Sequence, residues 1–272
     1  MKVVLFCGGQ GLRLREYGAS IPKPMVPIGG RPILWHIMKY YAHHGHKDFV
    51  LCLGYRADVV KEYFLDYSEA ISNDFVLRKG GRQVELLASD IDDWRITFAD
   101  TGQHSNIGER LAAVRPYLRG EETFLASYGD CLTDAPLDRL IDDFSARHAV
   151  ASFLSVRPTY PVHRVLRRDD GVVSAFERVA ESGLRINGGY FILRGTIFDA
   201  IEPGDELVVE PFRRLMATQQ LLAYRHDGFW APMDTLREHQ WLESVAADGR
   251  PPWAVWRRSD LDAALAVGGR TR

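Results

Sequence analysis

The chain has 272 residues, of which 46% are hydrophobic and 26% charged, and its formal net charge is −2. This size and composition are typical of a globular protein with one large core. The near-neutral charge argues against a general attraction to nucleic acid or to membrane surfaces, so any affinity for phosphate must be local. No apolar run reaches transmembrane length, and three cysteines lack metal-ligand spacing. With no secretion signal at the start, these features predict a cytoplasmic protein.

The first predicted element is a buried strand over residues 2–7, and three glycines follow it closely: Gly8, Gly9 and Gly11. Glycine allows backbone N–H groups to approach a ligand. Arg13 adds a fork of phosphate donors and Lys23 a compact positive charge. Together these residues predict a site for a polyphosphate and a second anion. The alternative is a plain strand-to-loop turn with scattered surface charges.

Two common phosphate-binding motifs do not fit this loop. No Gly-Lys-Ser/Thr follows, which excludes the P-loop, and Leu14 stands where the dinucleotide fingerprint needs its third glycine. A long segment with three prolines also separates the glycines from the first predicted helix, which begins at Pro32.

Strands and helices then alternate. Further apolar runs of strand length cover residues 48–53, 122–128, 150–156 and 221–226, and helical spacing covers residues 57–67 and 136–148. This order predicts an α/β fold with a doubly wound, mostly parallel sheet. Shorter runs over 75–87, 94–99, 164–168 and 172–177 predict small β excursions from it. We expect a single domain over residues 1–256 and a loose tail over 257–272.

Two polar segments are candidates for ligand contact. A loop over residues 100–111 leads into a helix, where free N–H groups can bind phosphate or read a base edge, or can simply begin the helix. Asp130 follows a predicted parallel strand, where a carboxylate points into the ligand crevice and suits Mg²⁺. The alternative for Asp130 is a turn or helix cap.

The glycine loop (Gly-Gly-x-Gly-x-Arg-Leu) and the following Pro-Lys-Pro-Met resemble the signature of the sugar-1-phosphate nucleotidyltransferases. Six further segments are similar to the glucose-1-phosphate cytidylyltransferase branch of this family. They cover residues 28–38, 47–49, 100–102, 128–130, 186–189 and 229–237. The resemblance implies a Rossmann-like nucleotidyltransferase fold whose β excursions cover the sugar. It also implies an enzyme that uses Mg²⁺, CTP and glucose-1-phosphate to make CDP-glucose and pyrophosphate. Homo-oligomers are common in the family, and residues 35–41 offer either such a contact or core.

The resemblance also assigns residue roles. Arg13 and Lys23 would be catalytic, and Asp130 and Asp234 would hold Mg²⁺. Nucleotide contacts would come from Gly8, Gly9, Gly11, Leu12, Arg13, Ser105, Gly108, Glu109 and Arg110. Sugar-phosphate contacts would come from Lys23, Arg178, Asn187, Gly188 and Glu210. Asp234 has the alternative role of helix N-cap, and Glu210 that of a solvated loop carboxylate.

Three departures from the family pattern fall at these contacts. Leu12 replaces a threonine, Glu109 replaces a glycine, and Arg178 with Val179 replaces Lys-Pro. A different nucleotide or sugar-1-phosphate is therefore an alternative, as is a catalytically weak nucleotide-sugar-binding regulatory protein. The presence of Arg13, Lys23, Asp130 and Asp234 argues against the second alternative.

Overall fold

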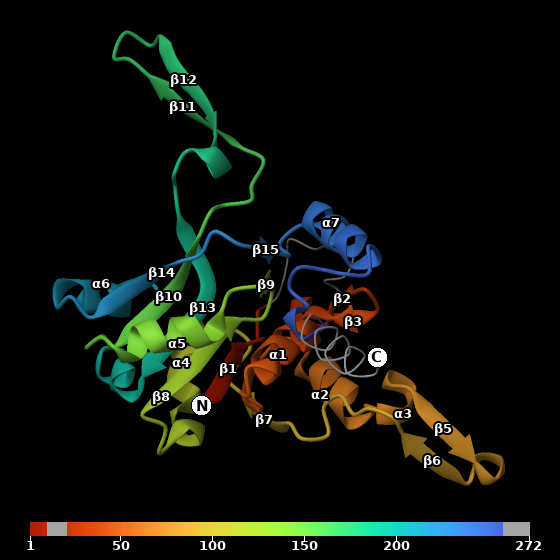
Figure 1. The fold of residues 1–272 in the computed structure, drawn as a ribbon. Helices are drawn as coiled ribbons and strands as arrows, with labels where there is room; N and C mark the ends of the chain where they lie inside the picture. The colour runs from red at the N-terminus through yellow and green to blue at the C-terminus, as the bar shows by residue number, and fades with distance from the viewer. Residues whose placement is uncertain (10–20, 258–272) are drawn as a thin grey trace, which may run out of the picture.

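The computed structural model describes residues 1–9 and 21–257 (Figure 1). A seven-stranded sheet lies at its centre, in the order β14-β10-β13-β8-β1-β4-β7. The strands are β1 (Lys2–Phe6), β4 (Asp48–Leu53), β7 (Arg95–Asp100), β8 (Thr123–Tyr128), β10 (Ala151–Val156), β13 (Ile186–Arg194) and β14 (Leu221–Arg225). Only β13 runs antiparallel to its neighbours in this sheet. The predicted α/β fold with a mostly parallel sheet is confirmed.

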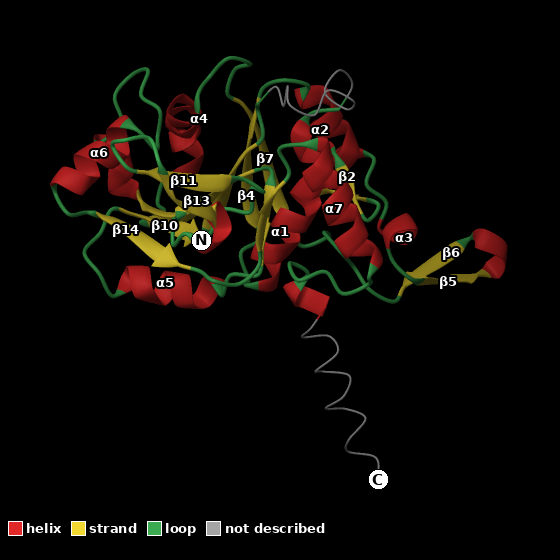
Figure 2. Cartoon of the chain, turned by 90° about the horizontal axis from the view of Figure 1, so that it is seen from above, coloured by secondary structure: helices red, strands yellow, loops and turns green. Residues whose placement is uncertain are grey.

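Helices cover both faces of the sheet (Figure 2). One face packs against α1 (Ile33–His43), α2 (Ala57–Leu65), α5 (Leu137–Ser145) and α7 (Leu236–Ala247), and the other against α4 (Ile107–Val114) and α6 (Glu210–Ala217). Each face has its own cluster of buried apolar side chains. Tyr40 and Tyr41 of α1 belong to the first cluster, and Trp35 is also buried, at 7% exposed. They are therefore core residues in this chain.

The chain reverses its direction of winding at β1. It passes from β1 through α1 to β4, continues to β7, and returns through α4 to β8 on the other side of β1. In open α/β sheets such a reversal opens a crevice beyond the carboxyl ends of the strands, and ligands bind there. This topology predicts a ligand crevice between the ends of β1 and β8.

Two hairpins extend from the body of the molecule in Figure 1. One is β5 (Phe75–Arg78) with β6 (Gln83–Leu86), next to the short α3 (Glu69–Ser72), and the other is β11 (His163–Arg167) with β12 (Val173–Arg178). The sequence prediction for residues 94–99 as a short excursion strand was wrong. Residues 95–99 fall in β7, which pairs with β4 as the edge strand of the main sheet, because Phe98 and Ala99 contribute apolar surface to the two core clusters.

Two small ladders lie close to the crevice. β2 (Pro27–Ile28) pairs with β3 (Arg31–Pro32), and β9 (Cys131–Thr133) pairs with β15 (Trp230–Pro232). The chain remains part of the core as far as Trp253 and Ala254, which are almost fully buried. In the part of the chain that the structure describes, no helix combines the length and the apolar character needed to cross a membrane. The predicted domain limits stay a prediction, since the tail beyond residue 257 lies outside the described residues.

Candidate active site

A cavity of about 510 Å³ opens at the predicted crevice. Its walls come from residues 6–9 at the end of β1, residues 128–130 at the end of β8, and residues 105–107 at the start of α4. Lys23, Glu206 and Asp234 complete the polar lining. The cavity therefore lies at the topological switch point of the sheet, where the first glycines and the predicted metal ligands meet.

Lys23 lies between two carboxylates at one end of the cavity. Its Nζ donates to Asp130 Oδ2 and to Asp234 Oδ1, each at 2.5 Å. The Lys23 side chain is only 13% exposed, and the carboxylates are 25% and 22% exposed. Burial opposes the charged ammonium, but the neighbouring carboxylates outweigh this effect and raise the pKa of Lys23. Lys23 is thus a permanently charged group at neutral pH.

The β9–β15 ladder brings the two carboxylates together. Asp130 directly precedes β9, Asp234 follows β15, and Met233 N donates to Asp130 O at 2.9 Å. The N-cap of α7 is Thr235, in a capping box with Glu238, and Glu238 also accepts a hydrogen bond from Asp234 N. The alternative role of Asp234 as the helix cap is therefore excluded. Its side chain is directed to Lys23 instead.

The donor set of this end fits a magnesium ion. Asp130 and Asp234 both reach the same point, and carboxylate oxygens are the ligands that Mg²⁺ prefers. Within residues 1–9 and 21–257, no group of three or more acidic, histidine or cysteine side chains is positioned to hold a metal. Mg²⁺ commonly takes one or two carboxylates together with substrate phosphates and water. The site thus matches a metal whose remaining ligands come from the substrate.

Gly8 and Arg110 have a shared structural role. A Cβ on Gly8 would lie 2.0 Å from Arg110 Nη1, so only glycine leaves room for this guanidinium. Arg110 is 3% exposed and donates to Gly8 O, Leu53 O and Thr101 Oγ1. These acceptors lie at or just beyond the ends of β1, β4 and β7, so Arg110 joins the carboxyl ends of three strands at the cavity wall. Gly9, in contrast, is exposed, and a Cβ there would meet nothing within 4 Å.

The loop before α4 contributes Ser105 to the cavity. Gly108 is needed elsewhere, because a Cβ on it would lie 2.2 Å from Asp205 O. Glu109 forms a capping box with Asn106, and it is exposed and absent from the cavity lining. Glu109, which replaces the glycine of the family pattern, thus caps the start of α4. The structure does not bring the Glu109 carboxylate to the cavity.

The predicted sugar residues are arranged around β13. Asn187 accepts from Gly189 N and donates to Tyr128 OH at 3.4 Å, and Tyr128 lines the cavity. A Cβ on Gly188 would crowd Val156 and the Trp230 indole. None of the three residues Asn187, Gly188 and Gly189 lines the cavity itself.

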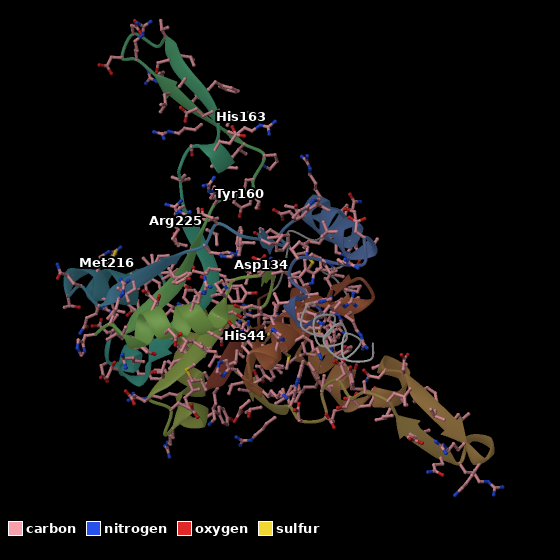
Figure 3. The ribbon with its side chains drawn as sticks, in the orientation of Figure 1. His44, Asp134, Tyr160, His163, Met216 and Arg225 are labelled. Atoms are coloured by element: carbon pink, nitrogen blue, oxygen red, sulfur yellow. The ribbon has the colours of Figure 1, made fainter. Side chains whose placement is uncertain are left out.

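Two other residues that were predicted to contact the sugar phosphate lie on elements other than β13. Glu210 is the first residue of α6 and accepts from Glu206 N, so it is a helix residue and not the loop carboxylate of the alternative interpretation. Arg178 ends β12, where its side chain is 72% exposed and 4.0 Å from Glu181. Its strand partner His163 lies on the extended hairpin in Figure 3, away from the body that carries Asp134. The structure does not bring Arg178 to the cavity.

Gly11, Leu12 and Arg13 lie outside the described residues, so their predicted roles stay predictions. Sequence reasoning missed Glu206, the third carboxylate of the cavity. Burial raises the pKa of Glu206, and hydrogen bonds from backbone N–H groups oppose the shift. Glu206 follows a Pro-Gly-Asp turn with no motif around it, so no local signal indicated a place in the site.

Comparisons with known proteins agree with this arrangement. The family described as Nucleotidyl transferase matches residues 2–165. This chain belongs to the nucleotidyl transferase family and is a nucleotidyltransferase enzyme. It is 40% identical, over 94% of its length and all of the relative, to a protein of Salmonella typhi named glucose-1-phosphate cytidylyltransferase. A Bacillus subtilis protein named probable glucose-1-phosphate cytidylyltransferase is 36% identical over the same shares.

Solved structures share the fold at lower sequence identity. A UDP-glucose pyrophosphorylase complexed with UDP-glucose superposes with a TM-score of 0.68 at 18% identity, covering 92% of this chain and 99% of the other. A putative glucose-1-phosphate thymidylyltransferase of Bacillus anthracis gives 0.65 at 15% identity, covering 91% and 96%.

Proposed function

We propose that this enzyme transfers a cytidylyl group from CTP to glucose-1-phosphate and releases CDP-glucose and pyrophosphate. The substrates are those in the names of relatives that align over their whole length at 36–40% identity. The observation that carries the chemistry is the convergence of Lys23, Asp130 and Asp234 at one end of the cavity. Three buried, unpaired cysteines are consistent with a cytoplasmic enzyme.

Charge neutralisation is the main catalytic task of these residues. The phosphate of glucose-1-phosphate attacks the α-phosphate of CTP, and both groups are anionic. Lys23 would neutralise charge around the two phosphates, and the cavity would hold them in line. Asp130 and Asp234 would hold Mg²⁺, which when bound would offset the charge of the triphosphate. The attacking phosphate is already ionised at neutral pH, so the reaction requires no general base.

The first test is pyrophosphate release in the presence of Mg²⁺. CTP, dTTP, UTP, ATP and GTP are each combined with a panel of sugar-1-phosphates. We expect the highest kcat/KM for CTP with glucose-1-phosphate. We expect no pyrophosphate release when EDTA removes the metal. Mass spectrometry of the product identifies CDP-glucose.

A second substrate pair is the alternative outcome. More distant relatives, such as a Candida albicans protein named mannose-1-phosphate guanyltransferase at 26% identity, share the family with other substrates in their names. Pyrophosphate release with another substrate pair would support nucleotidyl transfer but would assign different substrates to the enzyme. No release with any pair, with nucleotide binding intact, would contradict the enzymatic proposal and favour a regulatory protein that binds nucleotide sugars.

A further inference from the structure

The cavity wall at the start of α4 contains a carboxylate with no role in the reaction described above. Glu206 lies in the loop before α6, and its Oε2 accepts from Ile107 N at 3.3 Å. Among residues 1–9 and 21–257, no lysine or arginine forms an ion pair with Glu206. A carboxylate has two oxygens and about four acceptor positions. Glu206 therefore keeps acceptor capacity for a ligand in the cavity.

The other polar side chains at the start of α4 are already engaged. Asn106 accepts from Glu109 N and donates to Gly204 O, and Arg110 donates to Gly8 O, Leu53 O and Thr101 Oγ1. Ser105 donates its hydroxyl proton to Thr101 O at 2.6 Å, which leaves its oxygen as an acceptor. Glu206 and Ser105 thus present acceptors at the start of α4, and a ligand beside them must offer hydrogen-bond donors.

The charge of Glu206 limits which part of the substrates can lie beside it. A carboxylate repels phosphate, so the phosphates belong at the Lys23 end, and an uncharged part of a substrate faces Glu206. The walls on this side follow β1 and β7, in the fully parallel half of the sheet. That half of a doubly wound sheet binds mononucleotides, which favours the nucleotide base over the hexose.

We propose that Glu206 selects the nucleotide base by accepting a hydrogen bond from the 4-amino group of cytosine. Uracil and thymine have a carbonyl oxygen at this position, which is an acceptor and faces Glu206 without a shared proton. An unmatched pair of acceptors is costly in a partly buried site, because neither regains the water that it lost. Glu206 discriminates a 4-amino from a 4-oxo pyrimidine. This inference rests on the proposed use of CTP.

The test compares Glu206→Gln with the wild type in kcat/KM for CTP and UTP. Glutamine retains an oxygen for Ile107 N–H, so the start of α4 is kept, but its amide can also turn an N–H toward a 4-oxo group. We expect the CTP-to-UTP preference to fall roughly tenfold to a hundredfold, the range of a specific base contact. Calorimetric binding of CTP and UTP to the same proteins should show the same change.

Glu109→Gln is the matched control. Glu109 is also a glutamate at the start of α4, two residues after Ile107, but it lies outside the cavity lining. This variant should leave the preference unchanged. An equal loss for CTP and UTP in Glu206→Gln would overturn the proposal and indicate a purely structural role at α4. Altered discrimination between CTP and dCTP alone would overturn it in favour of a ribose contact.

A change confined to the KM of glucose-1-phosphate would also overturn the proposal, since it places the hexose beside Glu206. Failure of the proposed function is distinguishable, because the wild-type enzyme would then already lack activity with CTP. Thermal unfolding of Glu206→Gln shows whether the variant folds. Should its melting temperature fall, the nucleotide preference of the folded fraction still decides the question, since a ratio of kcat/KM does not depend on enzyme concentration.

Discussion

At the residue scale, the site depends on one cation shared by two carboxylates. Replacing Lys23 by alanine leaves Asp130 and Asp234 without their common partner and removes the charge that neutralises the phosphates. We expect kcat/KM to fall by about 100-fold or more, as for the loss of a transition-state donor. Lys39→Ala is the control, because Lys39 pairs with Asp90 away from the cavity. Unchanged turnover in Lys23→Ala would contradict the mechanism.

The same variant makes a prediction about metal binding. In the wild type, the Lys23 ammonium occupies the oxygens that a cation would use. Without it, two carboxylates repel each other, so Mg²⁺ should raise the melting temperature of Lys23→Ala more than that of the wild type. Differential scanning fluorimetry against Mg²⁺ concentration measures this. Equal shifts in both proteins would show that the metal binds elsewhere.

Two neighbouring glycines provide a matched pair for stability. Alanine at Gly8 meets the buried Arg110 guanidinium and would displace it from its three acceptors, whereas alanine at Gly9 meets nothing. We expect Gly8→Ala to lower the free energy of unfolding by about 2–4 kcal/mol, and Gly9→Ala to leave it within about 0.5 kcal/mol. Urea unfolding of both variants tests the difference, and equal losses would contradict the role of Gly8.

Residue types alone indicated part of the site. Lys23 and Asp130 were predicted because a glycine-rich anion loop and a strand-terminal carboxylate have recognisable local patterns. Glu109 and Arg178 were assigned through resemblance, and the structure shows Glu109 as a capping residue and Arg178 on an extended hairpin. A side chain's direction depends on helix capping and on tertiary packing, which a single sequence position does not specify.

At the scale of elements, the starts of two helices carry site residues. Capping boxes begin α4, directly after Ser105, and α7, directly after Asp234. Replacing Thr235 by alanine should cost about 1 kcal/mol of stability and also lower kcat, because Glu238, which accepts from Asp234 N, loses its hydrogen bond from the Thr235 hydroxyl. Ser68→Ala, at the N-cap of α3 and outside the cavity, should change stability alone. Unchanged kcat in Thr235→Ala would show that β15 suffices to place Asp234.

Most elements followed from apolar periodicity. The strand over Asp48–Leu53 was predicted at its observed bounds, and the turn at 169–171 indicated the β11–β12 hairpin. The edge strand β7 was misassigned because it follows a hairpin and an acidic turn, and pairing with β4 is a long-range contact that periodicity does not encode. The small β9–β15 ladder, which assembles the site, had no signal in its three-residue strands.

At the scale of the whole molecule, His36 joins the end of the described chain to α1. Its Nε2 bonds to Ile28 O and its Nδ1 accepts from Trp253 Nε1, so the buried ring is neutral. Burial lowers the pKa of His36 from 6.5 to about 4. His36 therefore binds a proton below about pH 6.5 in the unfolded chain, but only below about pH 4 in the folded chain. Stability should fall across this window by roughly 3 kcal/mol.

Denaturant unfolding between pH 7 and pH 4 measures this loss. His36→Gln cannot gain a proton and should show a flatter dependence, while the exposed His148→Gln should behave as the wild type. A wild-type slope retained in His36→Gln would assign the acid sensitivity to other groups.

Lys23 is 107 positions from Asp130 and 211 from Asp234 in the chain. The pair with Asp234 spans most of the chain, so the site is complete only when the protein has been synthesised as far as residue 234 and has folded. A shortened product of translation or proteolysis would lack the second carboxylate and could not turn over nucleotides. Bound substrate, in turn, connects the beginning, middle and end of the polypeptide, and should therefore slow its degradation by proteases that attack the unfolded chain.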